Sequence, residues 1–169
     1  IHLLNGAALK LHVVDHAGGN SGISDAYTIE IDIAPEAETV MIECDARLIS
    51  RAVNNLVQNS IKHNPRGCKI QLSLKSTDEA LILIVADNGV GLTPEKLQEL
   101  EEKPHYMEST DERLDLRHGL GLLLVRQIVE AHDGSIRMNG VSNQGCQTTL
   151  SFQTSKLKPS IYKTKKSGE

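Results

Sequence analysis

The chain has 169 residues, of which 39% are apolar, and a formal net charge of −4. This length suits a single domain that buries its core without disulfide or metal staples. The net negative charge and the scarcity of aromatic residues argue against a nucleic-acid surface, which needs a basic face and stacking rings. There is no Trp, and Phe152 is the single Phe. We therefore expect an aliphatic core, which suits helices packed on a sheet.

The cysteines and the absence of long apolar runs indicate a compartment. Cys44, Cys68 and Cys146 lack the CxxC pairing of zinc sites, so we expect reduced thiols and a cytoplasmic location. No run approaches the ~18 apolar residues of a membrane span, and no signal peptide is present, so we expect no membrane contact by this chain. Because the chain begins at Ile1 rather than Met, we expect a fragment whose parent protein is compatible with a membrane anchor.

The first half of the chain predicts strands followed by a helix. Alternating apolar residues predict strands at 8–14, 27–33 and 39–44, separated by a Gly-rich loop at 18–22 and by Pro35. From Asp45, a good N-cap, apolar residues recur at helical spacing until Pro65. The positions predicted to face the core are Leu48, Ile49, Ala52, Val53, Leu56, Val57, Ser60 and Ile61. The opposite stripe of this helix is Arg51, Asn55, Asn59 and Lys62.

The middle of the chain predicts a hairpin and then a long connection. Residues 69–76 and 80–86 have the pattern of two strands joined at Thr77-Asp78, which indicates an antiparallel hairpin. Asp87 stands where the second strand ends. The polar stretch 92–117 predicts at most a short helix near 95–101. A connection of this length and composition is typical of a functional lid or a disordered loop.

The last part of the chain predicts a helix, two strands and a tail. Apolar spacing predicts a helix over 121–132, closed by Asp133-Gly134. Strands at 135–141 and 145–152 follow. Because the strands come in adjacent pairs, we expect an α+β fold, a two-layer sandwich with a mixed, mostly antiparallel sheet and helices on one face. We expect this domain to cover residues 1–154. The lysine-rich segment 155–169 is predicted to be a solvated, disordered tail, with a membrane-surface role as the weaker alternative.

Three short segments carry candidate chemistry. Asn55, Asn59 and Lys62 follow i, i+4, i+7 spacing and so project from one side of their helix. A solvated polar face is the plain alternative, but Asn is a weak helix former and Asn54, Asn55, Asn59 and Asn64 crowd this stretch. A face that needs only solubility would more easily use Glu and Lys. The composition therefore favours a binding site.

The other two segments are glycine-rich. Asp87-Asn88-Gly89-Val90-Gly91 places a carboxylate beside a backbone that can approach a ligand, although Asp-Asn-Gly is also a common turn. Gly119-Leu120-Gly121-Leu122 opens a helix, where free N–H groups favour phosphate, although it also suits a flexible start to a buried helix. Walker and dinucleotide fingerprints are absent.

Taken together, these segments carry a resemblance. NNLVQNSIKHN, DNGVGL and GLGLLLVRQIVEAHDGSI resemble the N box and the two glycine boxes of the catalytic, ATP-binding domain of two-component sensor histidine kinases. These domains belong to the superfamily of gyrase, Hsp90 and MutL ATPases, with the Bergerat-type fold. The resemblance covers residues 8–152 and implies ATP and Mg²⁺ as cofactors.

The resemblance also implies roles for individual residues. Asn59 resembles the Asn that coordinates Mg²⁺, supported by Asn55, and Lys62 would reach a phosphate. Asp87 resembles the carboxylate that accepts from the adenine amine. The rest of the implied nucleotide-binding set is His63, Gly89, Gly91, Leu92, His118, Gly119, Leu120, Gly121 and Leu122, with Thr148 or Thr149 as the Thr that supports the adenine water.

Two departures from the family pattern bear on function. The lid region lacks a Phe-x-x-Phe pair, for which Leu97 and Leu100 are candidate substitutes, and no His stands in the sequence context of a phosphoacceptor. The family pattern implies that the acceptor His lies on a dimerisation domain outside this chain, with a response regulator receiver domain downstream.

Asn55 separates the possible activities. ATPases of the superfamily carry a Glu there as general base, whereas a neutral amide is a poor base. An imidazole nitrogen attacks without one, so Asn55 favours phosphotransfer to His over hydrolysis. Lid residues Arg113 and Arg117 are candidate charge-neutralising groups. The alternatives are a regulatory or scaffolding module that binds ATP without phosphotransfer, and a stand-alone hydrolase.

Overall fold

A five-stranded mixed sheet forms one layer of the molecule. The computed structural model describes residues 2–4, 27–102 and 120–154. In the order in which they pair, the strands are β2 (Thr28–Ile33), β4 (Lys69–Ser76), β5 (Ala80–Asp87), β7 (Gly145–Gln153) and β6 (Ser135–Val141). Only β2 and β4 are parallel, and the other three pairs are antiparallel. The predicted mostly antiparallel sheet and the predicted hairpin are confirmed.

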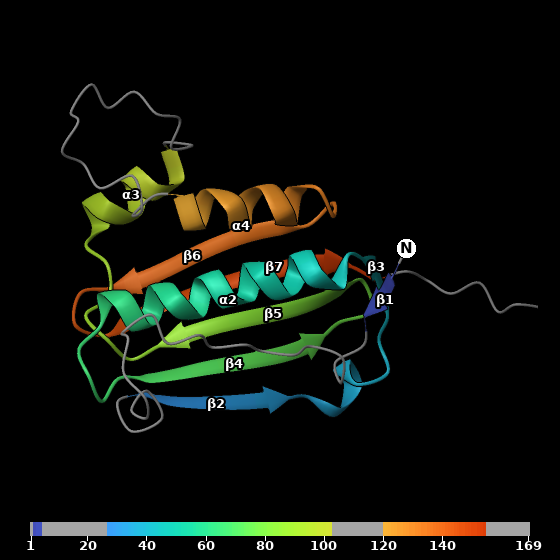
Figure 1. Ribbon diagram of the computed structural model, residues 1–169, viewed down its shortest axis with the longest axis horizontal. Helices are drawn as coiled ribbons and strands as arrows, with labels where there is room; N and C mark the ends of the chain where they lie inside the picture. The colour runs from blue at the N-terminus through green and yellow to red at the C-terminus, as the bar shows by residue number, and fades with distance from the viewer. Residues whose placement is uncertain (1, 5–26, 103–119, 155–169) are drawn as a thin grey trace, which may run out of the picture.

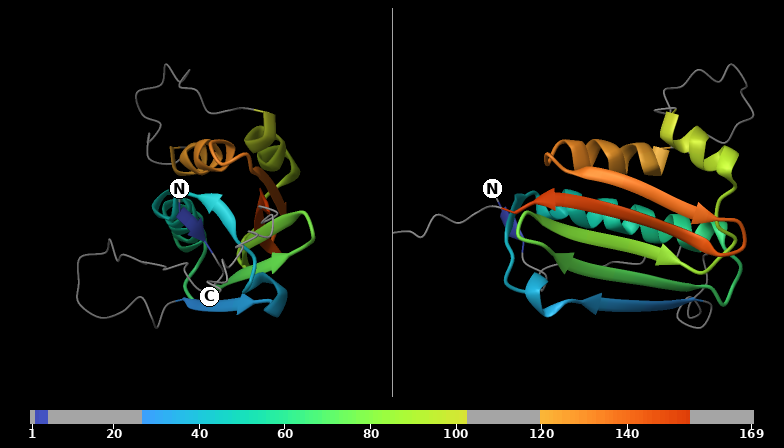
Figure 2. Two further views of the ribbon diagram at one scale, coloured as in Figure 1. Left: turned by 90° about the vertical axis from the view of Figure 1, so that its right-hand side faces the viewer. Right: turned by 180° about the vertical axis from the view of Figure 1, so that it is seen from behind.

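Two helices, α2 (Ala46–His63) and α4 (Leu120–Glu130), lie side by side on one face of this sheet (Figure 1). Seen from behind, the strands stand in front of α2, and no described helix covers that face (Figure 2). The short helix α3 (Pro94–Glu102) contacts β6. Its bounds agree closely with the helix predicted near residues 95–101. The predicted two-layer sandwich with helices on one face is therefore confirmed.

The segment before α2 differs from the prediction. Pro35 opens a short 3₁₀ helix, η2 (Pro35–Ala37), so the strand expected at 39–44 is reduced to β3 (Ile42–Cys44). β3 pairs with β1 (His2–Leu4), a strand that the sequence pattern did not indicate. The predicted strand at 8–14, the loop at 18–22, the tail 155–169 and most of the lid lie outside the described residues.

The core is aliphatic, as predicted from the composition. It lies between the sheet and the two helices, and its fully buried large residues are Ile49, Val53, Val57, Ile70, Val125, Val129 and Leu150. Leu48, predicted to face this core, is 37% exposed. That prediction is wrong because Ile49, Val53, Leu56 and Ser60 mark the middle of the buried stripe of α2, and Leu48 lies at its flank.

The N-terminus of α2 is fixed by its cap and by the end of α4. The Asp45 carboxylate accepts from the N–H groups of Arg47 and Leu48, at 2.8 and 3.2 Å, as expected for an N-cap. The Asp45 N–H donates to Nε2 of His132 at 2.9 Å, so the imidazole hydrogen lies on Nδ1, 2.6 Å from the Ile128 carbonyl oxygen. His132 thereby connects the two helices.

Tyr27 closes the other end of α2. Its hydroxyl donates to the carbonyl oxygens of Ile61 and Asn64, at 3.1 and 3.0 Å, in the last turn and C-cap of the helix. We expect Tyr27→Phe to lower the free energy of unfolding by about 1 kcal/mol, because the carbonyls lose this donor while the ring packing is retained. Urea unfolding followed by circular dichroism measures the change. An unchanged midpoint would show that water replaces the hydroxyl without loss.

Candidate functional site

Asp87 is the last residue of β5, and its side chain lies on the helix-covered face of the sheet. The Ser60 hydroxyl, from α2, donates to Oδ2 of Asp87 at 2.8 Å. The backbone N–H groups of Gly89 and Cys146 donate to Oδ1 at 3.1 and 3.2 Å. Three donors therefore fix this carboxylate, and Oδ2 keeps a lone pair for one further donor.

Two of these partners were missed by the sequence reasoning. Ser60 is 9% exposed and was assigned to the core stripe of α2, although it is the one hydroxyl in that otherwise apolar stripe. Cys146 lies directly opposite Asp87 in the β5–β7 register, a relation that needs the strand pairing to be known. A hydroxyl among buried aliphatic residues was the available signal for Ser60, because a buried polar group needs a partner.

The loop after Asp87 is held by Asn64. Oδ1 of Asn64 accepts from the Val90 N–H at 2.9 Å, and a Cβ at Gly89 would lie 1.9 Å from that oxygen. Gly91 has φ +68°, and a Cβ there would lie 1.9 Å from the Val141 carbonyl oxygen. The overlap at Gly91 is with backbone, so the packing of the protein requires a glycine there, whereas the overlap at Gly89 is with the Asn64 side chain, which would have to move. Leu92, next in the loop, packs against Gly140 of β6.

The amides of Asn55 and Asn59 converge on the start of α4. A Cβ at Gly121 would lie 3.3 Å from Oδ1 of Asn55 and 3.6 Å from Oδ1 of Asn59. The Asn55 amide nitrogen donates to the Arg51 carbonyl at 2.8 Å, which leaves Oδ1 as the group that faces α4. The first N–H groups of a helix lack partners within it, so two amide oxygens and a helix N-terminus meet here.

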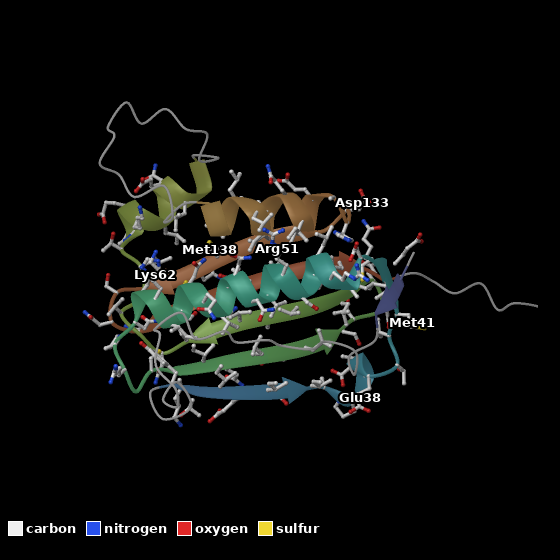
Figure 3. All side chains as sticks on the ribbon, in the orientation of Figure 1. Glu38, Met41, Arg51, Lys62, Asp133 and Met138 are labelled. Atoms are coloured by element: carbon white, nitrogen blue, oxygen red, sulfur yellow. The ribbon has the colours of Figure 1, made fainter. Side chains whose placement is uncertain are left out.

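Lys62 and His63 lie in the last turn of α2, and both side chains are exposed. Figure 3 shows Arg51 on the side of α2 that faces α4, and Lys62 near the C-terminal end of α2. Because Asn55 and Asn59 lie between them on the same stripe, the polar stripe follows the border between the two helices. The middle of the predicted polar stripe, Asn55 and Asn59, thus faces the start of α4.

Not every predicted residue is placed in the site. His118, Gly119, Arg113, Arg117 and the side chain of Leu120 lie outside the described residues. Leu122 is 8% exposed and its side chain belongs to the core, so only its backbone is available to a ligand.

Thr148 and Thr149 lie on opposite faces of the sheet. Thr148 is 5% exposed and lies between Val85 and Met138 on the face that α2 and α4 cover, which is the face of Asp87. Its hydroxyl makes no hydrogen bond with the described residues. Thr149 pairs with Ile84 and Arg137 on the other face. Of the two, only Thr148 is placed to serve the site.

Two thiols beside Asp87 stay protonated at neutral pH. Burial raises the pKa of Cys146 to about 11, and the negative charge of Asp87 contributes in the same direction. Burial and the same carboxylate raise the pKa of Cys68, against a hydrogen bond from the Asn88 backbone. The Asp87 carboxylate is therefore flanked by neutral sulfur groups.

The described residues offer amide oxygens, rather than a cluster of charged ligands, to a metal ion. Among the described residues, no three or more His, Cys, Asp or Glu side chains are grouped to hold a cation. The amide oxygens of Asn55 and Asn59 instead suit Mg²⁺, which takes oxygen ligands, keeps several waters and shares phosphate oxygens with its nucleotide.

No described helix is long and apolar enough to cross a membrane.

The sandwich, the fixed carboxylate and the amide pair at a helix start together define the class of ATP-binding α+β sandwich domains. The family described as histidine kinase-, DNA gyrase B-, and HSP90-like ATPase matches residues 44–156. The chain belongs to this family.

Relatives and solved structures agree with this assignment. The sensor histidine kinase YvrG of Bacillus subtilis is 30% identical over 130 residues, which cover 77% of this chain and 22% of that protein. The histidine protein kinase DivJ of Caulobacter vibrioides is 36% identical over 131 residues, which cover 77% of this chain and 21% of that protein. The chain thus spans about a fifth of the length of these relatives. The catalytic domain of the histidine kinase ThkA shares the fold, with TM-score 0.60, 21% identity, and coverage of 75% of this chain and 78% of that one.

Proposed function

We propose that this chain binds Mg-ATP and transfers the γ-phosphoryl group to a histidine on a dimerisation domain outside the chain, as the kinase part of a two-component system. The observation that carries the proposal is the Asp87 carboxylate, which three donors hold in place. The amides of Asn55 and Asn59 lie nearby, at the N-terminus of α4. The relatives that cover most of this chain are named as histidine kinases, and this supports the kinase assignment.

Asp87 recognises the base in this proposal. An ionised carboxylate accepts only, and the free lone pair of Oδ2 suits the exocyclic amine of adenine. Ser60 and the two backbone N–H groups hold the carboxylate in place before the nucleotide arrives, so little ordering is required on binding. The Thr148 hydroxyl, without a partner among the described residues, is available to a water beside the base.

Asn55, Asn59 and Lys62 hold the phosphates. Ser60 follows Asn59 in α2, so the base carboxylate and the amide pair are connected through adjacent residues of one helix. The amide oxygens of Asn59 and Asn55 would hold a Mg²⁺ ion, which would neutralise phosphate charge. Lys62 adds a point charge at the end of the stripe. The N–H groups at the start of α4 stabilise phosphate oxygens, and His63 and the residues around Gly119 complete the proposed set.

Asn55 favours an imidazole acceptor. Its amide nitrogen is held by the Arg51 carbonyl, and a neutral amide cannot remove a proton from water. A neutral histidine carries a lone pair on one ring nitrogen and attacks the γ-phosphorus directly. The protein then contributes position and charge neutralisation rather than a base. We also propose a response regulator receiver domain as the downstream partner, a cytoplasmic location, and a parent protein anchored in a membrane.

Calorimetric titration with a non-hydrolysable ATP analogue, with and without Mg²⁺, tests nucleotide binding. Phosphotransfer is then tested by mixing the chain with Mg-ATP and a histidine-bearing dimerisation domain from a relative, with that histidine replaced by Ala as control. Acid-labile phosphate on the intact acceptor alone is the expected result. Binding without transfer to any acceptor would favour a regulatory ATP-binding module, and rapid turnover by the isolated chain would favour a hydrolase.

Asn59→Ala separates metal binding from base binding. We expect about tenfold weaker affinity for the Mg-bound analogue, because one amide ligand of the metal is lost, and an unchanged affinity for the metal-free analogue. Titrations with Mg²⁺ and with a chelator measure the two affinities. Gln58→Ala, a neighbouring residue of α2 outside the proposed stripe, is the matched control. Equal weakening in both titrations would place Asn59 in packing rather than in the metal site.

A further inference from the structure

Asn64 contacts the loop after Asp87 at two successive residues. It is the C-cap of α2, with extended backbone angles of φ −115° and ψ 151°, and it follows Ser60 by four positions. Its Oδ1 accepts from the Val90 N–H at 2.9 Å, and a Cβ at Gly89 would overlap Oδ1, Cγ and Nδ2 of its amide. The sequence singles out Asn64 as one of the Asn residues that crowd this stretch, yet the proposed metal and base contacts do not use it.

The backbone of Asn64 is held by a contact of its own. Its carbonyl oxygen accepts from the Tyr27 hydroxyl at 3.0 Å, and the same hydroxyl donates to the Ile61 carbonyl oxygen at 3.1 Å. Tyr27 directly precedes β2, so this contact joins the end of α2 to an edge strand of the sheet. The Asn64 side chain therefore extends from a fixed backbone, and little further ordering is needed for it to hold the loop.

The loop residues that Asn64 contacts lead directly to the base carboxylate. The Gly89 N–H donates to Oδ1 of Asp87 at 3.1 Å, and the Val90 N–H belongs to the next peptide unit. Because peptide units are planar and rigid, a shift of the loop at Val90 also moves the Gly89 N–H. Ser60, in the last turn of α2, holds the other carboxylate oxygen at 2.8 Å. The end of α2 thus fixes Asp87 twice, directly through Ser60 and indirectly through Asn64.

The position of the Asp87 carboxylate decides which purine it accepts. Adenine presents an amine donor at C6, whereas guanine presents a carbonyl oxygen there, and an ionised carboxylate can only accept. Guanine nevertheless carries two donors next to that oxygen, its N1–H and its C2 amine. A carboxylate that shifts along the edge of the base would accept from these donors and bind guanine as well. Discrimination between the two bases therefore requires a carboxylate that keeps its place.

We propose that Asn64 is a positioning residue that sets the selectivity of this site for adenine over guanine. The inference rests on the proposed function. By holding Val90 and Gly89, Asn64 keeps the Gly89 N–H on Asp87 and the carboxylate at the place where it meets the adenine amine. The Val90 carbonyl oxygen also accepts from the Asn143 N–H at 2.7 Å. Loss of Asn64 therefore loosens the loop on the side of α2, while its contact with the β6–β7 turn remains.

Calorimetric affinities for non-hydrolysable analogues of ATP and GTP, both with Mg²⁺, test the inference. We expect the wild type to prefer the ATP analogue. Asn64→Leu, which keeps a branched side chain but removes the acceptor, should reduce the ratio of the two affinities about tenfold. Asn64→Asp keeps an oxygen acceptor at the same place and should keep the wild-type ratio. The ratio is the decisive quantity, because the two analogues share ribose, phosphates and metal, and a smaller folded fraction would weaken both alike.

Asn139→Leu, the same change at an exposed position of β6, is the matched control and should change neither affinity. If circular dichroism shows that Asn64→Leu is unfolded, Asn64→Ala replaces it, with the same expected loss of selectivity. If the wild type binds the ATP analogue but the ratio is the same in the wild type and in the variant, the inference is wrong and the proposed function stands. If the wild type binds neither analogue, the proposed function is overturned and the inference falls with it.

Discussion

Asp87→Asn should weaken ATP binding at least 100-fold while the fold is kept. The Asn side chain has nearly the shape of Asp, and its Oδ1 still accepts from the N–H groups of Gly89 and Cys146. Its amide nitrogen takes the place of Oδ2 and donates to the Ser60 hydroxyl, which then accepts. The adenine amine now meets a donor instead of an acceptor. Losing a charge-assisted hydrogen bond and leaving two donors opposed costs about 3 kcal/mol or more.

Calorimetry measures the affinity for the ATP analogue, and a thermal melt shows whether the variant keeps the stability of the wild type. Asp78→Asn, an exposed carboxylate beside the β4–β5 turn, is the matched control and should change neither. If Asp87→Asn bound the ATP analogue with wild-type affinity, the Asp87 carboxylate would not be the group that recognises the base. A large drop in melting temperature would instead show that the charge is needed by the three donors around it, and Ser60→Ala would then be the milder test of the same contact.

The helices and strands with a clear period could be predicted from the sequence. The apolar repeat from Ile49 to Val57 and the cap at Asp45 define α2, and alternation defines the β4–β5 hairpin. β3 was predicted too long because Pro35 starts a 3₁₀ turn, and β1 was missed because three residues carry too little pattern. Asp133, rather than Gly134, takes the left-handed conformation after α4, with φ 53°. Gly134 is needed instead for its close approach to Ser151.

The candidate site could be predicted from its three sequence segments, but not the contacts that join them. Asn55, Asn59 and Asp87 were predicted because three segments, in their order and spacing, together resemble one family pattern. Ser60 and Cys146 meet Asp87 through tertiary contacts between residues 27 and 59 positions apart, and no local pattern encodes such contacts. The choice between Thr148 and Thr149 required the register of β7, since adjacent residues of a strand face opposite sides.

Gly145→Ala should destabilise the protein far more than Gly67→Ala, although both glycines have nearly the same backbone, with φ +91° and +89°. A Cβ at Gly145 would lie 1.9 Å from the Asp87 carbonyl oxygen and 2.9 Å from Cα of Asn88, whereas a Cβ at Gly67 has nothing within 4 Å. Both variants carry the left-handed strain of about 1–2 kcal/mol. Gly145→Ala adds an overlap with backbone, worth about 1–3 kcal/mol more, because no rotamer change can relieve it.

The comparison also tests how the site is built. Relief of the overlap requires the ends of β5 and β7 to separate, and this moves the Cys146 N–H away from Asp87. We therefore expect Gly145→Ala to lose about 2–5 kcal/mol of unfolding free energy together with most of its ATP affinity. Gly67→Ala should lose about 1–2 kcal/mol and bind normally. Urea unfolding and calorimetry on both variants decide this. Equal stability of the two would mean that the strand ends yield easily, and Asp87 would then be fixed by Ser60 and the Gly89 N–H alone.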